Sequence, residues 1–295
     1  MYRNFEELKS IEKDIQSTLV VAAAHDMHTL EAVFASAKEH DTRYILVGHR
    51  EKIITISTEL GIVPDPDSIV DGGDDADCAR IAVELIRSGN GNALMKGILD
   101  TATLLKAVLN KESGVRGSGT LSHLAMIESP GYHKLVGVTD GGMIPRPTFE
   151  QKIDIVKNAA GYFRNIGYKK PKIAALCAAE TVSPKIPETV EAAELQEMCR
   201  KGELEDCILE GPISFDLAIS KETAKIKGYK SEISGESDIL LVPDITAGNI
   251  LVKSLVYWGK SKMAGCIIGA KVPIVLASRG ASAEEKLLSI MISCY

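Results

Sequence analysis

The sequence predicts a doubly wound α/β fold, and three observations support this. Short apolar runs alternate with longer helical patterns almost to the end of the chain. The apolar runs are continuous and do not alternate with polar residues, which is typical of parallel strands covered by helices on both faces. The chain has 295 residues, enough for one large or two medium domains, each with its own core.

The individual elements follow from this alternation. The predicted strands are Thr18–Ala24, Tyr44–Gly48, Ala93–Lys96, Leu135–Thr139, Lys172–Cys177, Asp238–Val242, Ala264–Ile268 and Pro273–Ala277. The helical patterns include Asp75–Arg87, Thr148–Gly161, Glu188–Lys201, Thr246–Gly259 and Ser282–Ser293. Thr148 with Gln151, and Ser282 with Glu285, have the spacing of a capping box and indicate helix starts. A Gly- and Ser-rich stretch near 111–119 (KESGVRGSG) indicates a domain junction.

The composition excludes several classes of protein. A net charge of -6 gives the molecule no overall attraction to nucleic acid or to an anionic membrane. The N-terminus lacks the apolar core of a signal peptide, and no apolar run approaches the roughly 20 residues that span a bilayer. The cysteines form no CxxC pair, and we expect free thiols in the reducing cytoplasm. They are Cys78, Cys177, Cys199, Cys207, Cys266 and Cys294.

Small, hydroxyl-bearing and charged residues follow several of the apolar runs. Ligands of open parallel sheets bind outside the carboxyl ends of the strands, where glycine lets the backbone come close and helix starts favour phosphate. The residues in question are Lys96–Gly97, Asp140–Gly141–Gly142, Asp244 with Gly248–Asn249, and Ser278–Arg279–Gly280. The pattern favours a small anionic or phosphorylated substrate, with cations such as Lys96, Lys185 and Arg279 supplying local positive charge. Turns need the same residue types, so a purely structural explanation stays open.

Several segments, in order along the chain, resemble the phosphate acetyltransferase/phosphate butyryltransferase family. They are MKGILDTATLLKAVLNKE (Met95–Glu112), LSHLAMIESPGYHKLVGVTDGGM (Leu121–Met143), PKIPETVEAAELQEMCRKGE (Pro184–Glu203), EGPISFDLAIS (Glu210–Ser220), SDILLVPDITAGNILVKSLVYW (Ser237–Trp258) and GAKVPIVLASRGASAEEK (Gly269–Lys286). The length of the chain and the LSH segment look more like phosphate butyryltransferases. In place of the Asn-Ile that family members often carry after TDGGM, this chain has Ile144–Pro145–Arg146, so the loop is expected to work differently, with Arg146 as a candidate for the site.

The resemblance implies two doubly wound α/β domains with a cleft between them, as in enzymes of the isocitrate/isopropylmalate dehydrogenase type. We expect residues 1–125 plus 278–295 in the first domain, to which the final helix returns, and 126–277 in the second. The implied reaction is butyryl-CoA, or another short acyl-CoA, plus phosphate giving acyl phosphate plus CoA, by direct attack in a ternary complex. It needs no metal or redox cofactor. The implied assembly is a homodimer or a larger homo-oligomer.

Three residues are candidates for catalysis. Arg279 can bind phosphate oxygens bidentately, and Ser278 can donate a hydrogen bond to the carbonyl oxygen or the thiol. Glu285 stands where the resemblance implies an acidic base, although a carboxylate serves as a base only if burial raises its pKa. Each also has a structural explanation: a surface arginine, a turn-forming serine and a capping-box glutamate, respectively.

The remaining candidates are expected to bind substrate. Lys96 and Gly97 end a strand, Thr101 is expected to cap the next helix beside the same anion, and Lys106 matches a basic position of the family. Ser122 and His123 lie in the LSH segment, where the histidine is a candidate acid or base. Further candidates from strand ends are Asp140, Asp244 and Asn249. Each of these residue types is also common in turns, in helix caps or on a solvated surface.

Two other functions compete with the acyltransferase. A metal- and NAD-dependent hydroxyacid dehydrogenase of the same architecture needs clustered aspartates and a dinucleotide motif, and the sequence shows neither paired aspartates on one helix nor a GxGxxG after a strand. His25 and His28 form an HxxH without an evident third ligand, so we expect no metal site. A non-catalytic CoA-sensing or oligomerisation module is the second alternative, which the altered loop at Ile144–Arg146 keeps open.

Overall fold

The computed structural model describes residues 1–10, 16–117, 119–276 and 281–295. Two compact units emerge from the contacts within the chain. We call residues 9–121 with 264–295 the first unit, and residues 1–8 with 122–263 the second unit. This grouping differs from the expected domains mainly at the N-terminal residues 1–8 and at 264–277, each of which joins the other unit.

The first unit is built on a mainly parallel sheet. Its strands run in the order β3-β2-β1-β4-β11-β10, and all are parallel to their neighbours except β10, which is antiparallel to β11. The strands are β1 (Thr18–Ala22), β2 (Arg43–Gly48), β3 (Ile69–Asp71), β4 (Ala93–Lys96), β10 (Lys262–Ile268, from Ala264 on in this unit) and β11 (Ile274–Val275). The helices are α2 (Met27–His40), α3 (Arg50–Glu59), η1 (Pro66–Ser68), α4 (Asp75–Arg87), α5 (Thr101–Val108) and α11 (Ala283–Ser293).

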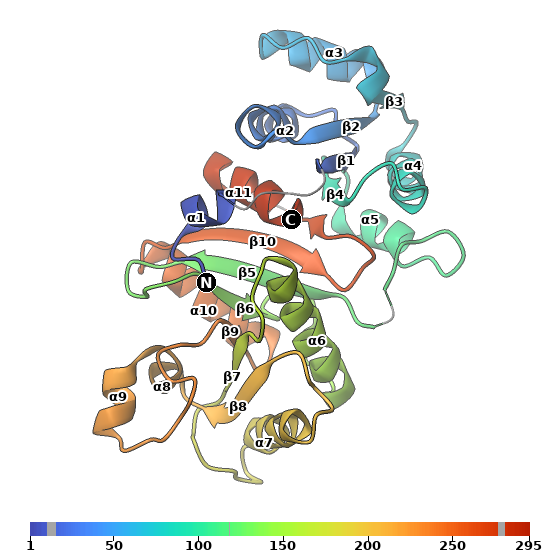
Figure 1. The fold of residues 1–295 in the computed structure, drawn as a ribbon. Coiled ribbons are helices and arrows are strands. Elements are labelled where there is room, and N and C mark those ends of the chain that lie inside the picture. Colours follow the sequence, from blue (N-terminus) through green and yellow to red (C-terminus); the bar gives the residue numbers. More distant parts are fainter. Residues whose placement is uncertain (11–15, 118, 277–280) are drawn as a thin grey trace. The chain divides into compact units, whose positions relative to one another are not determined.

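Helices cover both faces of this sheet. One face buries Leu19, Val21 and Met95 against apolar side chains of α2, α3 and α11. On α11, Ile290 belongs to this cluster, so the final helix does pack in the first unit. Helix α4 packs against β1, β2 and β4, and α5 packs against α4. In Figure 1 the unit comprises α2 to α5 and β1 to β4, coloured blue to green, together with the orange to red β10 and α11. Burial on both faces explains why the strands read as uninterrupted apolar runs.

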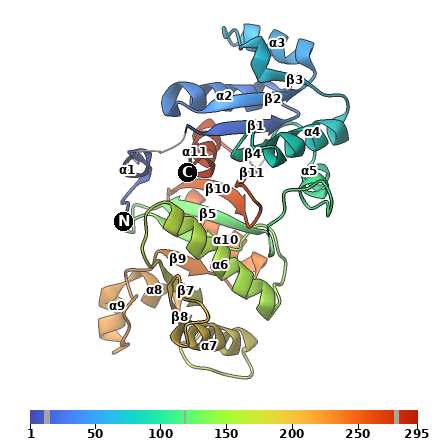
Figure 2. The ribbon, with the colours of Figure 1, turned by 45° about the vertical axis from the view of Figure 1, so that its right-hand side comes forward.

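The second unit repeats this arrangement with a strand order of β5-β6-β9-β7-β8. Its strands are β5 (Ser122–Glu128), β6 (Val136–Thr139), β7 (Lys172–Leu176), β8 (Ile208–Ile213) and β9 (Ile239–Leu241). Its helices are α1 (Phe5–Lys9), α6 (Phe149–Asn165), α7 (Pro187–Arg200), α8 (Phe215–Ile219), α9 (Lys221–Ile226) and α10 (Ile245–Tyr257). Helices α8, α9 and α10 share a core with one face of the sheet, and α6 and α7 pack against β5, β6 and β8 (Figure 2).

The structure confirms a mixed α/β fold but corrects the expectation of wholly parallel sheets. Strands β10 and β11 are antiparallel, and so are β5 and β6. Only a few residues connect each pair, whereas a parallel crossover needs a dozen or more. The predicted runs Ala264–Ile268 and Pro273–Ala277 are separated by so few residues that, as neighbours in the sheet, they had to be antiparallel. Three strands were not predicted, namely β3, β5 and β8.

The N-terminal segment is fastened to the second unit. The amide of Leu135 donates to the carbonyl oxygen of Tyr2 at 2.9 Å, and the amide of Phe5 donates to the Glu128 carboxylate at 2.7 Å. Phe5 and Leu8 are buried.

In the same unit the fully buried Lys134 bonds through Nζ to Asp238 Oδ1 at 2.5 Å and to the Glu236 carbonyl at 2.7 Å. No helix in the described parts of the chain is both long and apolar enough to cross a bilayer.

Candidate functional site

Asp140 organises the loop at the carboxyl end of β6. Its side chain is only 2% exposed. Oδ1 accepts hydrogen bonds from the amides of His123 at 3.2 Å, Gly142 at 2.9 Å and Met143 at 2.9 Å, and Oδ2 accepts from the amide of Ile144 at 3.0 Å. A carboxylate that accepts this many amide bonds fixes the path of the backbone. Asp140 therefore supports the loop 141–144 instead of presenting its charge to a substrate.

Two close approaches made by glycine pack this loop. A Cβ atom at Gly248 would lie 2.6 Å from the Cα of Gly141, and a Cβ at Gly142 would lie 2.8 Å from Cγ of His123. The first contact joins the loop to the start of α10, and the second lays it on the imidazole ring. Only glycine allows the backbone to come this near.

His123 is the second residue of β5, and the antiparallel register with β6 places it opposite Asp140. Thr139 Oγ1 donates to its carbonyl oxygen at 2.8 Å. Desolvation lowers the pKa of the ring, and the charge of Asp140 opposes this. The imidazole is therefore largely neutral at pH 7 and can accept a proton or donate a hydrogen bond. Its neighbour Ser122 is wholly buried and accepts a hydrogen bond from Asn158 Nδ2 at 3.1 Å. This hydroxyl is thus engaged within its own unit.

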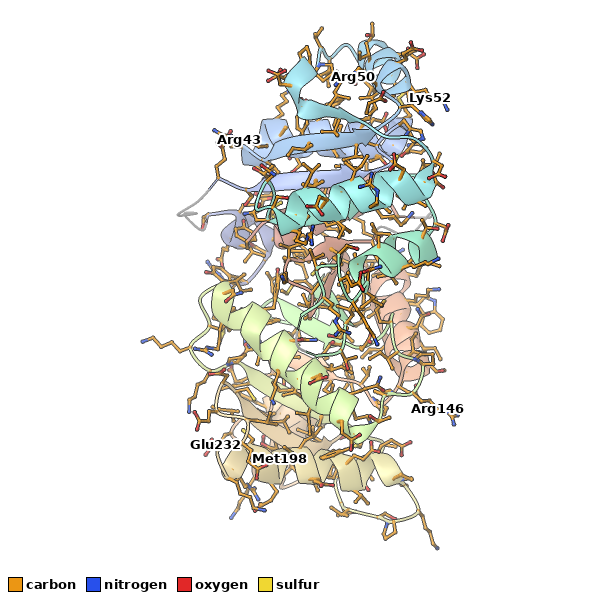
Figure 3. The ribbon with its side chains drawn as sticks, turned by 90° about the vertical axis from the view of Figure 1, so that its right-hand side faces the viewer. Arg43, Arg50, Lys52, Arg146, Met198 and Glu232 are labelled. Carbon is orange, nitrogen blue, oxygen red and sulfur yellow. The ribbon has the colours of Figure 1, made fainter. Side chains whose placement is uncertain are left out.

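The start of α10 lies next to the same loop. Asp244 caps the helix by accepting from the amide of Ala247 at 2.9 Å. The amide of Ile245 donates to the carbonyl oxygen of Pro145 at 3.3 Å, so the altered segment Ile144–Arg146 is tied to this helix. Asn249 follows Gly248 and is exposed, which leaves its amide available to a ligand. Arg146 is exposed and extends away from its own unit in Figure 3.

A second set of candidates lies in the first unit, where β4 ends beside β1. Lys96 is half-buried, and its ammonium donates to the carbonyl oxygens of Gly97 and Leu99 at 3.0 Å each. A Cβ at Gly97 would lie 2.2 Å from the carbonyl oxygen of Ala23, which follows β1. The neighbouring backbone therefore leaves room only for glycine at this position. The bonds of Lys96 turn its positive end toward the loop that follows the strand.

The helix that follows is not capped by Thr101. Asp100 is the N-cap, with its carboxylate accepting from the amide of Thr103 at 2.9 Å and from Thr103 Oγ1 at 2.6 Å. The prediction failed by one residue because an aspartate in extended conformation precedes the threonine. The hydroxyl and amide of Thr103 lower the pKa of Asp100. This negative charge occupies the helix start and disfavours a second anion there. Thr101 and Lys106 are both exposed, on different faces of α5.

Glu285 has a raised pKa, which a carboxylate needs in order to act as a base. It lies in the first turn of α11, its amide donating to Ser282 Oγ at 3.1 Å, as the capping-box spacing predicted. Burial raises the pKa of its carboxyl group, and the Ser282 contact partly offsets this. The other two catalytic candidates, Ser278 and Arg279, lie outside the described residues.

One pairing in the first unit was not predicted. The rings of His25, after β1, and His49, after β2, lie 4.7 Å apart between centroids. Desolvation lowers the pKa of His25, and His49 and Lys52 add to the effect. His49 directly follows the predicted strand Tyr44–Gly48, so a search of the residue after that strand would have found it. Within the described ranges, no three His, Cys, Asp or Glu side chains are grouped as metal ligands.

The second unit thus brings His123, Asp140, Asp244 and Asn249 together at one sheet edge. Residues 74–294 match the family described as "Phosphate acetyl/butaryl transferase". The chain belongs to this family. It is 37% identical over 294 residues to the phosphate butyryltransferase of Clostridium acetobutylicum, covering 99% of this chain and 98% of that protein. The phosphate acetyltransferase of Thermotoga maritima is 39% identical over 290 residues and covers 98% of each chain.

Solved structures agree with this membership. A branched-chain phosphotransacylase from Enterococcus faecalis superposes with a TM-score of 0.82 at 35% identity, covering 94% of this chain and 98% of that one. A 4-hydroxythreonine-4-phosphate dehydrogenase from Salmonella typhimurium shares the fold with a TM-score of 0.59 at 12% identity, covering 95% of this chain and 99% of that one. This chain therefore shares a fold with that dehydrogenase, and the likeness to the isocitrate/isopropylmalate type stays a prediction.

Proposed function

We propose that this chain is a phosphate acyltransferase that interconverts a short acyl-CoA plus phosphate with acyl phosphate plus CoA. The observation that carries the proposal is the likeness to the Clostridium acetobutylicum phosphate butyryltransferase over nearly the whole of both chains. The polar strand ends of both units are chemically suited to small anionic substrates. The dehydrogenase alternative has no comparable support, because its likeness is confined to the fold.

The reaction is a direct acyl transfer. In the direction of thioester synthesis, the CoA thiol loses its proton, the sulfur attacks the carbonyl carbon of the acyl phosphate, and the carbon–oxygen bond to phosphate breaks. The electron pair leaves with the phosphate, so no electron acceptor is required. We therefore propose that CoA and phosphate are substrates and that no metal or redox cofactor takes part.

Glu285 is the proposed base for the thiol proton. Its raised pKa brings the carboxylate nearer to the basicity that proton transfer at neutral pH requires. In the proposed mechanism Arg279 holds the phosphate group and Ser278 stabilises the carbonyl oxygen. Lys96, Gly97, Thr101, Lys106, Asp244 and Asn249 are proposed to bind the substrates, and neutral His123 to donate to them or accept from them. For Asp140 we propose a supporting role, because its oxygens are already engaged with four amides.

The decisive experiment is a substrate panel. Purified protein is given phosphate with acetyl-, propionyl-, butyryl- or isobutyryl-CoA, and the release of free thiol is followed. We expect phosphate-dependent release, faster with butyryl or branched acyl groups than with acetyl. One methylene is worth only about 1–3 kcal/mol of discrimination, so a graded preference is expected rather than an absolute one. Thiol release at the same rate without phosphate would contradict the proposal.

Two comparisons separate the alternatives. Addition of NAD with hydroxyacids tests the dehydrogenase, for which reduction of the nucleotide is the diagnostic. The non-catalytic module is favoured if the wild type binds CoA but forms no acyl phosphate, and if Arg279→Ala leaves this behaviour unchanged. We further propose a cytoplasmic homodimer or larger homo-oligomer, which sedimentation of the purified protein tests.

A further inference from the structure

A cavity of about 750 Å³ lies in the second unit, at the outer edge of its sheet. It is bounded by the end of α7, by Ile208–Glu210 of the edge strand β8 and by the loop Tyr229–Glu232. The loop is held to the strand because Ser231 Oγ donates to Glu210 Oε2 at 2.8 Å. None of the predicted site residues lines this cavity. Figure 3 labels Glu232, which lines the cavity, and Met198 on α7, which precedes the lining residue Cys199.

Two cysteines line the cavity and lie beside each other. Cys199 lies in the last turn of α7, and Cys207 directly precedes β8. The Cys199 thiol donates to the carbonyl oxygen of Cys207 at 3.2 Å, which places its sulfur next to that residue. Cys199 is partly exposed, whereas Cys207 is only 4% exposed. A reagent in the cavity therefore reaches Cys199 first, with Cys207 immediately behind it.

The rim of the cavity carries positive charge. Lys170, Arg200 and Lys230 line it, all three are exposed, and none makes an ion pair with another described residue. Of the acidic lining residues, Glu210 is engaged by Ser231, and Glu232 is exposed. Unpaired cations around a concave surface concentrate small anions there and raise the rate at which they arrive.

We propose that Cys199 and Cys207 form a redox-active pair that reacts with anionic disulfides of low molecular weight entering this cavity. The proposal is independent of the acyltransferase reaction. The cysteine arrangement in the sequence gave no hint of it, because seven residues separate the two positions and only the turn between α7 and β8 brings them together.

The chemistry balances without a further reactant. The Cys199 thiol loses its proton, and its sulfur attacks one sulfur of the small disulfide RSSR, releasing RS⁻ and leaving a mixed disulfide on Cys199. The Cys207 thiol then loses its proton, attacks the Cys199 sulfur and expels the second RS⁻, which is protonated like the first. The protein pair is oxidised and RSSR is reduced to two RSH. Burial and the neighbouring Cys199 raise the pKa of Cys207 to about 12, so Cys207 acts second.

The test treats the native full-length protein with glutathione disulfide, which is anionic, or cystamine, which is cationic, and follows intact mass and peptide linkage. The wild type should lose two hydrogens and yield a Cys199–Cys207 crosslink. Cys207→Ser should stop at one glutathione on Cys199, and Cys199→Ser should give neither product. Cys177→Ser is the matched control, because Cys177 is also partly exposed but outside the cavity, and it should react like the wild type.

The charged rim is tested separately. Arg200→Gln should slow the reaction with glutathione disulfide about tenfold and leave the cystamine rate unchanged or higher. The neighbouring Lys201→Gln is the control, because Lys201 does not line the cavity. A wild type that gives no Cys199–Cys207 crosslink, or a mixed disulfide that forms in Cys199→Ser at the wild-type rate, would overturn the proposal. Equal slowing of both reagents by Arg200→Gln would overturn the role of the cations. Circular dichroism of each variant shows that it is folded.

Discussion

The loop after β6 should depend on Asp140 more than on any helix cap nearby. Replacing Asp140 by alanine removes the acceptor of four amides, those of His123, Gly142, Met143 and Ile144. Hydrogen bonds to a charged group contribute about 1.5–3 kcal/mol each when buried. Gly142 is exposed, and the other three residues are partly exposed, so water replaces part of the loss. We therefore expect Asp140→Ala to lower the free energy of unfolding by about 4 kcal/mol, near 1 kcal/mol for each bond.

Asp140→Asn gives a sharper version of the same test. The amide oxygen can keep the three bonds made by Oδ1, but the NH₂ group then faces the amide of Ile144, donor against donor. We expect a loss of about 2 kcal/mol. Asp244→Asn is the matched control, because asparagine caps a helix as well as aspartate does, and it should cost less than about 0.5 kcal/mol.

Urea unfolding followed by circular dichroism measures all three variants. If Asp140→Asn were no more destabilising than Asp244→Asn, the carboxylate would not be what holds the loop. The activity of the folded variants adds a second measurement. Because the loop rests on His123 through Gly142, Asp140→Asn should also reduce turnover in the phosphate-dependent assay at temperatures where it stays folded.

Three further changes test other parts of the structure. Gly248→Ala places a methyl group 2.6 Å from the Cα of Gly141, and it should cost about 1–3 kcal/mol of unfolding free energy and reduce activity, measured by urea titration and thiol release. Glu285→Gln should lower the rate of thioester synthesis by about 10²–10⁴-fold and remove the limb of the pH profile that rises as the wild-type carboxyl loses its proton. Because burial raises that pKa, the wild type should also lose stability relative to Glu285→Gln as pH rises through it, which melting at several pH values checks. Lys134→Met leaves Asp238 buried without its cation and should cost about 3–5 kcal/mol, measured by urea unfolding, whereas Lys134→Met with Asp238→Asn should recover part of the loss.

Much of the fold could be predicted because strands buried on both faces are recognisable in the sequence as continuous apolar runs. Val20 and Leu46 lie in runs apolar on both faces, and helix α4 was predicted at its observed bounds. Strand β5 was missed because it opens with Ser122 and His123 and looked like part of a loop. Strand β8 contains Gly211–Pro212, a pair that argues against a strand in sequence but is tolerated at an edge.

The candidate site was predictable in place but less so in role. Strand ends pointed to Asp140 and Asp244, and the structure shows both carboxylates engaged with backbone amides of their own loops. Sequence cannot tell a carboxylate that binds a substrate from one that binds amides, because both uses favour the end of a strand. Ser122 shows the same difficulty, since its hydroxyl is bonded to Asn158, 36 residues further along the chain.

The way the chain is shared between the two units has a consequence for its synthesis. The core of the first unit uses Val275, Ile290 and Cys294 near the C-terminus, together with strands from the first third of the chain. The second unit uses Phe5 and Leu8 from the very beginning. A ribosome can therefore release the complete second unit while the first still lacks its last helix. During that interval the part of the apolar cluster that α11 covers is exposed on α2, and chaperones that bind exposed apolar surface would find it there.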